Sequence, residues 1–204
     1  MLDAIPPTEI VVTAERAPGE AKDTPATVSI IDEQRIDRLG EPLIAPLLRL
    51  TPSVAVATSG TAGSFTEVRI RGAESNHTLL FIDGIRANDP ATGNQPRFDL
   101  LNADIASRIE VVRGPQSALW GSEAVGGVVA LNGVASERNG YSAAAEGGSF
   151  GFRRLSTSAE VMSGPANAAI SLGYQRARGI DAFDGTGDRD GYRNLSGRFR
   201  GTFD

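Results

Sequence analysis

Apolar and polar residues alternate one by one over the C-terminal third of the chain. In the last segment the odd positions of 195–203 are apolar or glycine, and the even positions of 194–202 are polar. Segments 154–161 and 167–174 alternate in the same way. A period of two places alternate side chains on opposite faces of a β-strand. The pattern fits strands that pack an apolar face on a soluble core, and equally strands that separate lipid from a polar lumen.

The connections between these predicted strands differ in length. Gly147–Phe152 and Ser163–Asn167 are short, whereas Arg178–Tyr192 is long and acidic. Bacterial outer-membrane barrels have short turns on the periplasmic side and longer loops outside. We therefore predict about four antiparallel strands over residues 140–204.

Residues 24–135 have a mixed pattern that predicts one domain with a single small core. A strand is expected at Ala26–Ile31. Asp32 is a suitable N-cap for the helix that follows, which Gly40 ends. A second apolar helix is expected at Pro42–Leu50. Further short strands, separated by glycine-containing turns, are predicted at Thr66–Arg71, Thr78–Asp83, Ile109–Arg113 and Gly127–Leu131.

Residues 1–23 are predicted to form a flexible arm. Pro6, Pro7 and Pro18 exclude a continuous helix. The arm contains one β-prone segment, Ile10–Thr13, whose charged neighbours prevent it from burying itself locally. Such an isolated segment is typical of a strand that adds to the sheet of a partner.

Composition excludes several classes of protein and site. The chain has 204 residues, a net charge of −5, no cysteine and a single histidine. Disulfides and thiolate metal sites are excluded, and nucleic acid is not expected as a partner. Neither a serine-nucleophile elbow nor a phosphate-binding loop occurs, so we predict that the protein is not an enzyme. The first residues do not resemble a signal peptide, which we expect to have been removed or to lie upstream of the start.

Four segments carry a resemblance to a known family. They occur in the family's order and at a similar spacing: Glu9–Arg16, Thr66–Gly72 with Leu80–Arg86, Ile109–Ser122, and Ala124–Val129. They resemble, in turn, the TonB box, the IRG…LIDGVR pair, the IEVVRGPxSxLYGS segment and the AxGGVVNI strand of TonB-dependent outer-membrane receptors. Within this family the chain is most similar to vitamin B12 (cobalamin) receptors.

The resemblance implies a fold and a function. The expected fold is an α+β plug domain (24–135) followed by the antiparallel β-strands of an incomplete transmembrane β-barrel (140–204), behind an arm (1–23) with a TonB box. The expected function is TonB-dependent uptake of a scarce, bulky solute, cobalamin as the first candidate, across the bacterial outer membrane. Expected partners are outer-membrane lipid and the TonB C-terminal domain, with ExbB and ExbD behind it. The expected TonB-binding residues are Glu9, Ile10, Val11, Val12 and Thr13.

The resemblance also selects charged and turn residues of the plug. Charged side chains in the motifs are expected to pair with one another and with a polar barrel wall, and glycines are expected in turns. Any one of these charges alone would also fit solvated surface. The set is Arg69, Arg71, Gly72, Asp83, Gly84, Arg86, Glu110, Arg113, Gly114 and Pro115, with Glu67 as a further acidic partner.

Two ligand sites follow from the resemblance. Plug loops at Phe65, Glu67, Glu74, Thr92 and Gly93 are expected to face the substrate, although Glu74 replaces the neutral amide of cobalamin receptors. The long loop is expected to bind calcium through Asp181, Asp188 and Asp190, because close carboxylates suit this cation. Thr186 stands there in place of an amide side chain, and a solvated acidic loop is the alternative.

The number of predicted strands departs from the family. Unpaired strand edges are not tolerated in lipid, so four strands alone are not expected to span a membrane. We therefore expect a fragment, a truncated non-transporting receptor or a split receptor. The alternative from another class is a soluble plug-like binding or interaction module.

Overall fold

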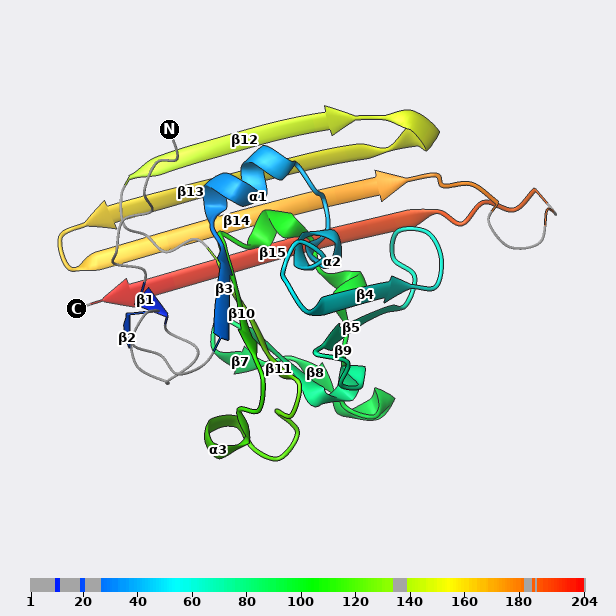
Figure 1. Cartoon of the computed structure of the whole chain (residues 1–204). Helices are drawn as coiled ribbons and strands as arrows, with labels where there is room; N and C mark the ends of the chain where they lie inside the picture. The colour runs from blue at the N-terminus through cyan, green and yellow to red at the C-terminus, as the bar shows by residue number, and fades with distance from the viewer. Residues whose placement is uncertain are drawn as a thin grey trace, which may run out of the picture.

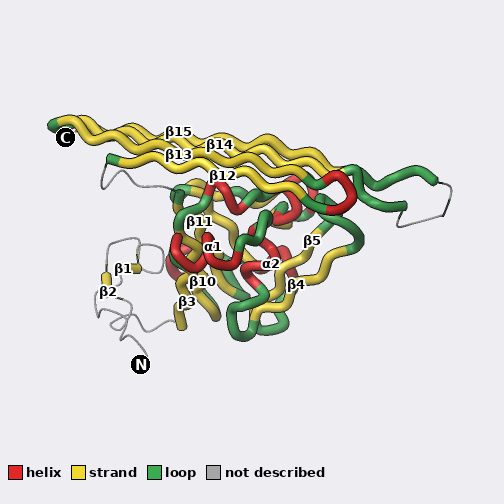
Figure 2. The backbone as a smooth tube through the Cα atoms, turned by 90° about the horizontal axis from the view of Figure 1, so that it is seen from above, coloured by secondary structure: helices red, strands yellow, loops and turns green. Residues whose placement is uncertain are grey.

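The computed structural model describes residues 10–11, 19–20, 27–133, 139–181, 185 and 187–203. It contains an α/β domain, residues 27–133, and a four-stranded C-terminal sheet, residues 140–203 (Figure 1). Seen from above, the sheet forms a layer across one side of the α/β domain (Figure 2). The predicted fold class, an α+β domain followed by antiparallel strands, is confirmed. The predicted domain boundaries stay predictions, since residues 21–26 and 134–138 lie outside the described residues.

The α/β domain is built around a five-stranded sheet of order β3-β10-β11-β6-β7. Its strands are β3 (Thr27–Ile31), β10 (Arg108–Arg113), β11 (Gly127–Asn132), β6 (Thr78–Ile82) and β7 (Ile85–Arg86). The β6–β11 pair is parallel, and the other pairs are antiparallel. Residues along β10 and β11 are buried on both faces of the sheet, which explains their nearly continuous apolar sequence.

Two short helices cover one face of this sheet. In α1 (Glu33–Leu39) the Asp32 carboxylate accepts the Arg35 backbone N–H at 2.8 Å, and Gly40 ends the helix with φ 63°. Helix α2 (Ile44–Leu48) is shorter than predicted. Pro46 is tolerated because it lies in the first turn, where a backbone N–H has no intrahelical acceptor. Both helices contribute to the main core, which also contains Leu80, Phe98 and Val111.

Smaller elements complete the domain. Strands β4 (Val54–Thr58), which the sequence pattern did not predict, and β5 (Thr66–Ile70) form a hairpin, as do β8 (Asn88–Asp89) and β9 (Gln95–Pro96). Asp83 (φ 51°) and Gly84 (φ 80°) form the two-residue turn between β6 and β7, where both positions need positive φ. The remaining helices are α3 (Ser117–Trp120) and the 3₁₀ turns η2 (Ser75–His77), η3 (Pro90–Thr92), η4 (Phe98–Leu100) and η5 (Ala103–Ile105).

The C-terminal sheet is antiparallel, in the order β12-β13-β14-β15. Its strands are β12 (Gly140–Gly147), β13 (Arg153–Ser163), β14 (Ala166–Ala177) and β15 (Tyr192–Phe203), with the turn η6 (Ser149–Gly151) between the first two. The number of strands and the short, short, long order of their connections are confirmed. No helix within the described ranges is both long enough and apolar enough to cross a membrane.

Only part of the N-terminal arm is described. Strand β1 (Ile10–Val11) pairs antiparallel with β2 (Gly19–Glu20). The other expected TonB-binding residues, Glu9, Val12 and Thr13, lie outside the described residues. TonB binding therefore stays a prediction.

Candidate functional site

The C-terminal sheet turns its polar face toward the α/β domain and its apolar face outward. On β14, Ser171 and Gln175 are each 1% exposed, whereas Leu172 between them is 45% exposed. On β15, the outward-facing Leu195 and Phe199 are 78% and 73% exposed. The apolar face of these strands therefore does not pack on the core of the α/β domain in the described part of the chain. The interface between the two layers is accordingly polar.

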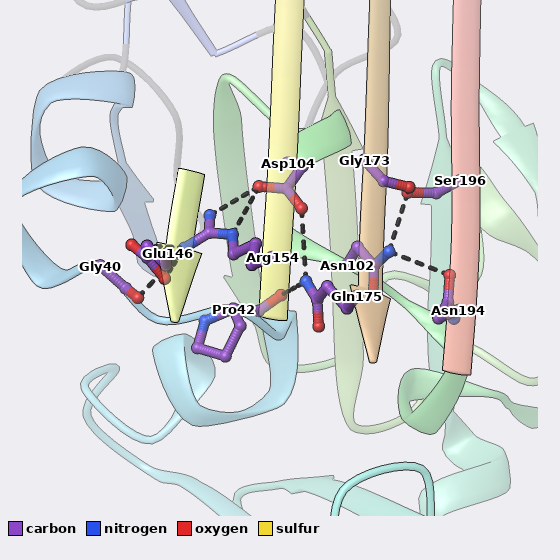
Figure 3. A network of polar contacts seen from close by, with 10 residues as sticks. All are labelled: Gly40, Pro42, Asn102, Asp104, Glu146, Arg154, Gly173, Gln175, Asn194 and Ser196. Atoms are coloured by element: carbon purple, nitrogen blue, oxygen red, sulfur yellow. Dashed lines mark hydrogen bonds and ion pairs between the residues drawn. The ribbon is translucent and has the colours of Figure 1, made fainter. Parts of the chain in front are cut away.

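A buried carboxylate, Asp104 of η5, is the centre of this interface (Figure 3). Arg154 of β13 donates to Asp104 Oδ1 from Nε at 2.8 Å and from Nη2 at 2.6 Å, and the two side chains are 13% and 1% exposed. Arg154 Nη1 also reaches Glu146 of β12 and the Gly40 carbonyl, each at 3.3 Å. Gln175 Nε2 donates to the Pro42 carbonyl at 2.6 Å and to Asp104 Oδ2 at 3.3 Å.

The sheet has a glycine opposite this carboxylate. A Cβ atom at Gly173 of β14 would lie 2.7 Å from the Asp104 Cβ atom. Any larger residue at this position would push η5 away from the strand. Gly173 is therefore a close-approach position at which the domain and the sheet fit together.

A second buried amide lies on the other side of η5. Asn102 is fully buried, and its Nδ2 donates to Asn194 Oδ1 and to Ser196 Oγ, both at 2.9 Å (Figure 3). Asn194 Nδ2 in turn donates to the Leu100 carbonyl at 3.0 Å. The short segment from η4 to η5 thus binds β13, β14 and β15 through polar side chains.

Asp83, one of the predicted motif residues, also reaches the sheet. Its carboxylate forms an ion pair with Arg198 of β15, with Nη2 at 2.6 Å, and accepts the Gly133 backbone N–H at 3.1 Å. Partial burial alone would raise the pKa of Asp83, but the bonds from Arg198 and Gly133 and the positive charge of Arg198 outweigh it and lower the pKa. The carboxylate is therefore held in its charged form.

The other predicted charges stay within the α/β domain. Arg69 pairs with Glu67 at 2.8 Å, and Arg86 pairs with Glu123. Glu110 is fully buried and binds Arg108 at 2.7 Å. The guanidinium of Arg113 donates to the Pro52 carbonyl and to Ser29, and that of Arg71 donates to Thr27 and covers Gly114. Gly72 (φ 77°) and Gly114 (φ 107°) have the left-handed backbone expected of turn residues, and Pro115 next to Gly114 is exposed.

The motif set contains both kinds of expected pair: Arg69 pairs with Glu67 inside the set, and Asp83 pairs with Arg198 of the C-terminal sheet. Glu110 and Arg86 pair with residues of the α/β domain outside the set, Arg108 and Glu123. The motif analysis missed the partners Arg108, Glu123 and Arg198, and it missed Arg154, which pairs with Asp104 outside the set. The alternating pattern contained the signal for two of them, because Arg154 and Arg198 lie on the polar face of their strands.

A further ion pair, between the partly exposed Arg97 and the buried Asp99, lies at the start of η4. Arg97 donates to Asp99 at 3.1 Å from Nε and at 2.7 Å from Nη2, and the Asp99 side chain is 1% exposed. The hydrogen bond and the charge of Asp99 raise the pKa of Arg97. This bidentate pair stabilises the chain at the entry to the segment that meets the sheet.

A cavity of about 770 Å³ remains between α1 and the sheet. Its wall includes Asp37 of α1, Glu146 and Ser142 of β12, and Glu160 and Ser158 of β13. Carboxylates and hydroxyls of this kind hold water, so this side of the interface is suited to hydration.

The loops expected to face substrate adjoin one another. Strand β5 packs against η2, and η2 packs against β9. Asn94 next to Gly93 donates to the Asn76 carbonyl at 3.3 Å, which joins the Thr92–Gly93 loop to the Glu74 segment. Phe65 is 42% exposed, and Glu74, Thr92 and Gly93 are exposed. The tip of the β4–β5 hairpin meets Tyr192 at the start of β15, because a Cβ atom on Gly63 would overlap the Tyr192 ring.

The predicted calcium ligands are not gathered in this structure. Asp181 accepts the backbone N–H groups of Gly185 at 3.0 Å and Gly187 at 2.7 Å, and Asp188 and Asp190 are exposed. Among the residues that the structure describes, no group of three His, Cys, Asp or Glu side chains is placed to hold a metal ion. The geometry therefore does not fit a site formed by these three aspartates as they stand, and calcium binding stays a prediction.

Comparisons with known proteins agree with this arrangement. Residues 20–128 match the model of the TonB-dependent Receptor Plug Domain family. The chain is 35% identical over 193 residues to the vitamin B12 transporter BtuB of Photobacterium profundum, covering 91% of this chain and 31% of that transporter. The chain thus spans about a third of the length of this curated relative.

Solved structures show the same fold. The siderophore receptor PiuA from Acinetobacter baumannii matches with a TM-score of 0.71 and 23% identity, over 92% of this chain and 25% of that chain. The ferripyoverdine receptor of Pseudomonas aeruginosa matches with a TM-score of 0.71 and 22% identity, over 84% and 23%. The alcaligin receptor FauA from Bordetella pertussis matches with a TM-score of 0.67 and 20% identity, over 83% and 30%. With the plug-domain match over more than half of its length, the chain belongs to the family of TonB-dependent outer-membrane receptors.

Proposed function

We propose that this chain supplies the plug and the first barrel strands of a receptor that imports a scarce, bulky solute, with cobalamin as the first candidate. The observation that carries this proposal is the orientation of the C-terminal sheet, with its apolar face outward and its polar face bound to the plug. Such a sheet is stable where lipid covers one side and a hydrated protein interior covers the other. The similarity to a vitamin B12 transporter supports the choice of cobalamin.

The chemistry of the interface suits a plug that has to move. Asp104, Asn102 and Gln175 bind the sheet through hydrogen bonds and one ion pair. When these hydrogen bonds break, water molecules bind the groups that have lost their partners. Separating two apolar surfaces would instead expose both of them to water and lose the whole hydrophobic contribution to the free energy. The plug can therefore rearrange inside the barrel at a moderate free-energy cost. No bond of the solute is broken, and no catalytic residue is required.

Coupling to TonB is the energy input in this proposal. The segment Glu9–Thr13 would add as a strand to the TonB C-terminal domain, which gives a junction of backbone hydrogen bonds. Phe65, Glu67, Glu74, Thr92 and Gly93 of the plug would contact the solute. The contact between the tip of the β4–β5 hairpin, next to Phe65, and Tyr192 at the start of β15 supports this choice. Force on the arm would then act on the plug while the barrel stays in the membrane.

Uptake of radiolabelled cobalamin tests the proposal. The gene product that carries this chain is expressed in a bacterial strain that lacks its own cobalamin receptor, with ferric siderophores as the alternative solutes. Val11→Pro should reduce uptake and TonB pulldown at least tenfold, because proline removes the backbone donor of the added strand. Val11→Thr keeps that donor and the β-branch, and should behave like wild type. Cobalamin uptake that is absent in wild type, or unchanged by Val11→Pro, would contradict the proposal.

Calcium binding is tested separately. If Asp181, Asp188 and Asp190 bind Ca²⁺ together, the ion has to compete with the backbone N–H groups that now donate to the Asp181 carboxylate. It also has to bring the three aspartates together. Calorimetric titration of the receptor with Ca²⁺ should then give heat that the Asp188→Asn/Asp190→Asn variant lacks. Equal heats from both proteins would leave the loop as solvated acid.

A further inference from the structure

Three arginines lie side by side at one end of the outward face. In the strand register Arg153 of β13 is opposite Arg176 of β14, and Arg176 is opposite Arg193 of β15. On β12 the corresponding residue is Gly147, so the row ends there. Arg153, Arg176 and Arg193, which we name the arginine row, are all exposed. None of them forms an ion pair or hydrogen bond with the residues that the structure describes.

The arginine row directly follows the apolar surface. The next register row on the same face is Leu155, Tyr174 and Leu195. From Leu195 to Phe203 the outward face of β15 extends about 27 Å at ~3.4 Å per residue. At a strand tilt of about 40° this corresponds to roughly 21 Å of membrane depth, close to the ~25 Å apolar band of outer-membrane barrels. The guanidinium groups therefore lie at the depth of the lipid headgroups.

The charge of the row calls for an anion. Side chains directly opposite on neighbouring strands are about 5 Å apart, and like charges at this separation destabilise a sheet. Arginine binds phosphate oxygens through two parallel hydrogen bonds, so one or two phosphate groups across the row would replace repulsion by attraction. A free phosphate ion would meet only the row itself.

An apolar groove beside the row indicates that the anion carries a hydrocarbon chain. The groove has a volume of about 440 Å³ and opens on the outward face. Its wall includes Ala143 and Ala145 of β12, Leu155 of β13, Leu172 and Tyr174 of β14, and Leu195 of β15. The groove exists because the small alanine side chains leave space between the larger side chains around them. Its shape and chemistry suit an acyl chain that runs down from a headgroup on the arginine row.

We propose that the arginine row and this groove bind a phosphate-bearing lipid of the outer leaflet. The choice of leaflet rests on the proposed function, because the row lies at the end of the sheet where the long loop begins. Along the length of the sheet, strands β1 and β2 of the arm lie toward the other end (Figures 1 and 2). A bound lipid would fix the depth of the first barrel strands and cover the groove.

Native mass spectrometry of the receptor in detergent tests the site with lipid A, which carries two phosphates. The triple variant Arg153→Gln/Arg176→Gln/Arg193→Gln should lower the apparent affinity for lipid A at least tenfold. Arg153→Lys/Arg176→Lys/Arg193→Lys should keep most of it, because the charge remains. The control Arg35→Gln/Arg38→Gln/Arg49→Gln has the same change in charge on the plug and should bind like wild type.

Two further binding experiments change the ligand and keep the protein unchanged. Lipid A without phosphates should bind the wild type as weakly as intact lipid A binds the glutamine variant. Inorganic phosphate should not displace lipid A, since it has no acyl chain for the groove. Equal binding by wild type and the glutamine variant, or displacement by phosphate, would overturn the lipid site. Cobalamin uptake is measured on the same proteins. Absent uptake in wild type contradicts the proposed function. Equal binding of lipid A by wild type and the glutamine variant contradicts only the lipid site.

Discussion

The plug and the C-terminal sheet use apolar residues in opposite directions. Phe98 of the plug is fully buried in the main core, whereas Phe199 of β15 is 73% exposed on the outward face. Polar side chains such as Gln175 are buried where the sheet meets the plug. Both regions obey the same hydrophobic effect, and they differ in what surrounds them. The plug buries apolar surface away from water, whereas the sheet binds the plug with its polar face and, in the proposed receptor, would present its apolar face to lipid.

As a consequence, the interface between the plug and the C-terminal sheet is held together without an apolar core. Folded domains that stay together usually bury apolar surface between them. Here two polar layers meet through Asp104, Asn102 and Asp83, whose partners come from different strands of the sheet. Specific geometry rather than apolar area positions the plug, and this is compatible with movement.

The largest expected effect is the difference in plug stability between removing the buried Phe98 ring and removing the outward-facing Phe199 ring. Phe98→Ala removes a fully buried ring from the plug core and should lower the free energy of plug unfolding by about 3–5 kcal/mol. Phe199→Ala removes the same ring from the outward face and should leave plug unfolding unchanged. Hydrogen–deuterium exchange of β10 and β11 in the receptor measures this difference. Equal loss of protection in both variants would show that the two regions do not have separate cores.

Breaking the polar joint should have the next largest effect. Asp104→Ala leaves the Arg154 guanidinium largely buried without its main partner, and should weaken the docking of the plug by about 2–4 kcal/mol. Arg154→Ala in the same background should cost little more, because the pair is already lost. A double-mutant cycle on urea-induced release of the plug gives the coupling energy. Additive effects of the two changes would mean that the ion pair does not hold the interface.

A charge on the outward face should disturb membrane insertion and not the plug. Ile170→Arg places a guanidinium in the middle of β14 on the lipid side and should cost about 2–3 kcal/mol on folding into vesicles. Thr202→Arg adds the same side chain to the other face of the sheet and should cost far less. The measurement is reversible unfolding of the receptor from lipid vesicles. A larger penalty at Thr202 would reverse the assignment of the two faces.

The smallest expected effect is a pH dependence at Asp83. Its pKa is lowered in the folded protein, so its contribution to stability is present above the unfolded pKa of about 3.9 and is lost as pH falls through the folded pKa. Since the side chain is partly exposed, the contribution should be below about 1 kcal/mol. Asp83→Asn should therefore flatten plug stability below about pH 4. The same acid dependence in Asp83→Asn and wild type would assign it to other carboxylates.

Local elements of the plug could be predicted from residues alone. The Asp32 cap, the Gly40 stop and the Asp83–Gly84 turn depend on backbone geometry within a few residues, and all three occur as expected. Strand β4 could not be predicted, since its short alternation gains meaning only from pairing with β5. The pairing of charges could not be predicted either, because Arg154 and Asp104 are far apart along the chain and meet only after both layers have formed.

The alternation along the chain is enough to assign the residues of β13, β14 and β15 to two faces, because a strand puts alternate side chains on opposite sides whatever surrounds it. The motifs of the chain also determined the family. The fold was needed to identify the face that turns inward, since alternation is the same for a soluble sheet and for a barrel wall. It also decided which polar groups hold the plug to the sheet. Asp104, Asn102 and Gln175 are ordinary polar residues in the chain, and they become a buried joint only because Gly173 lets η5 approach the sheet.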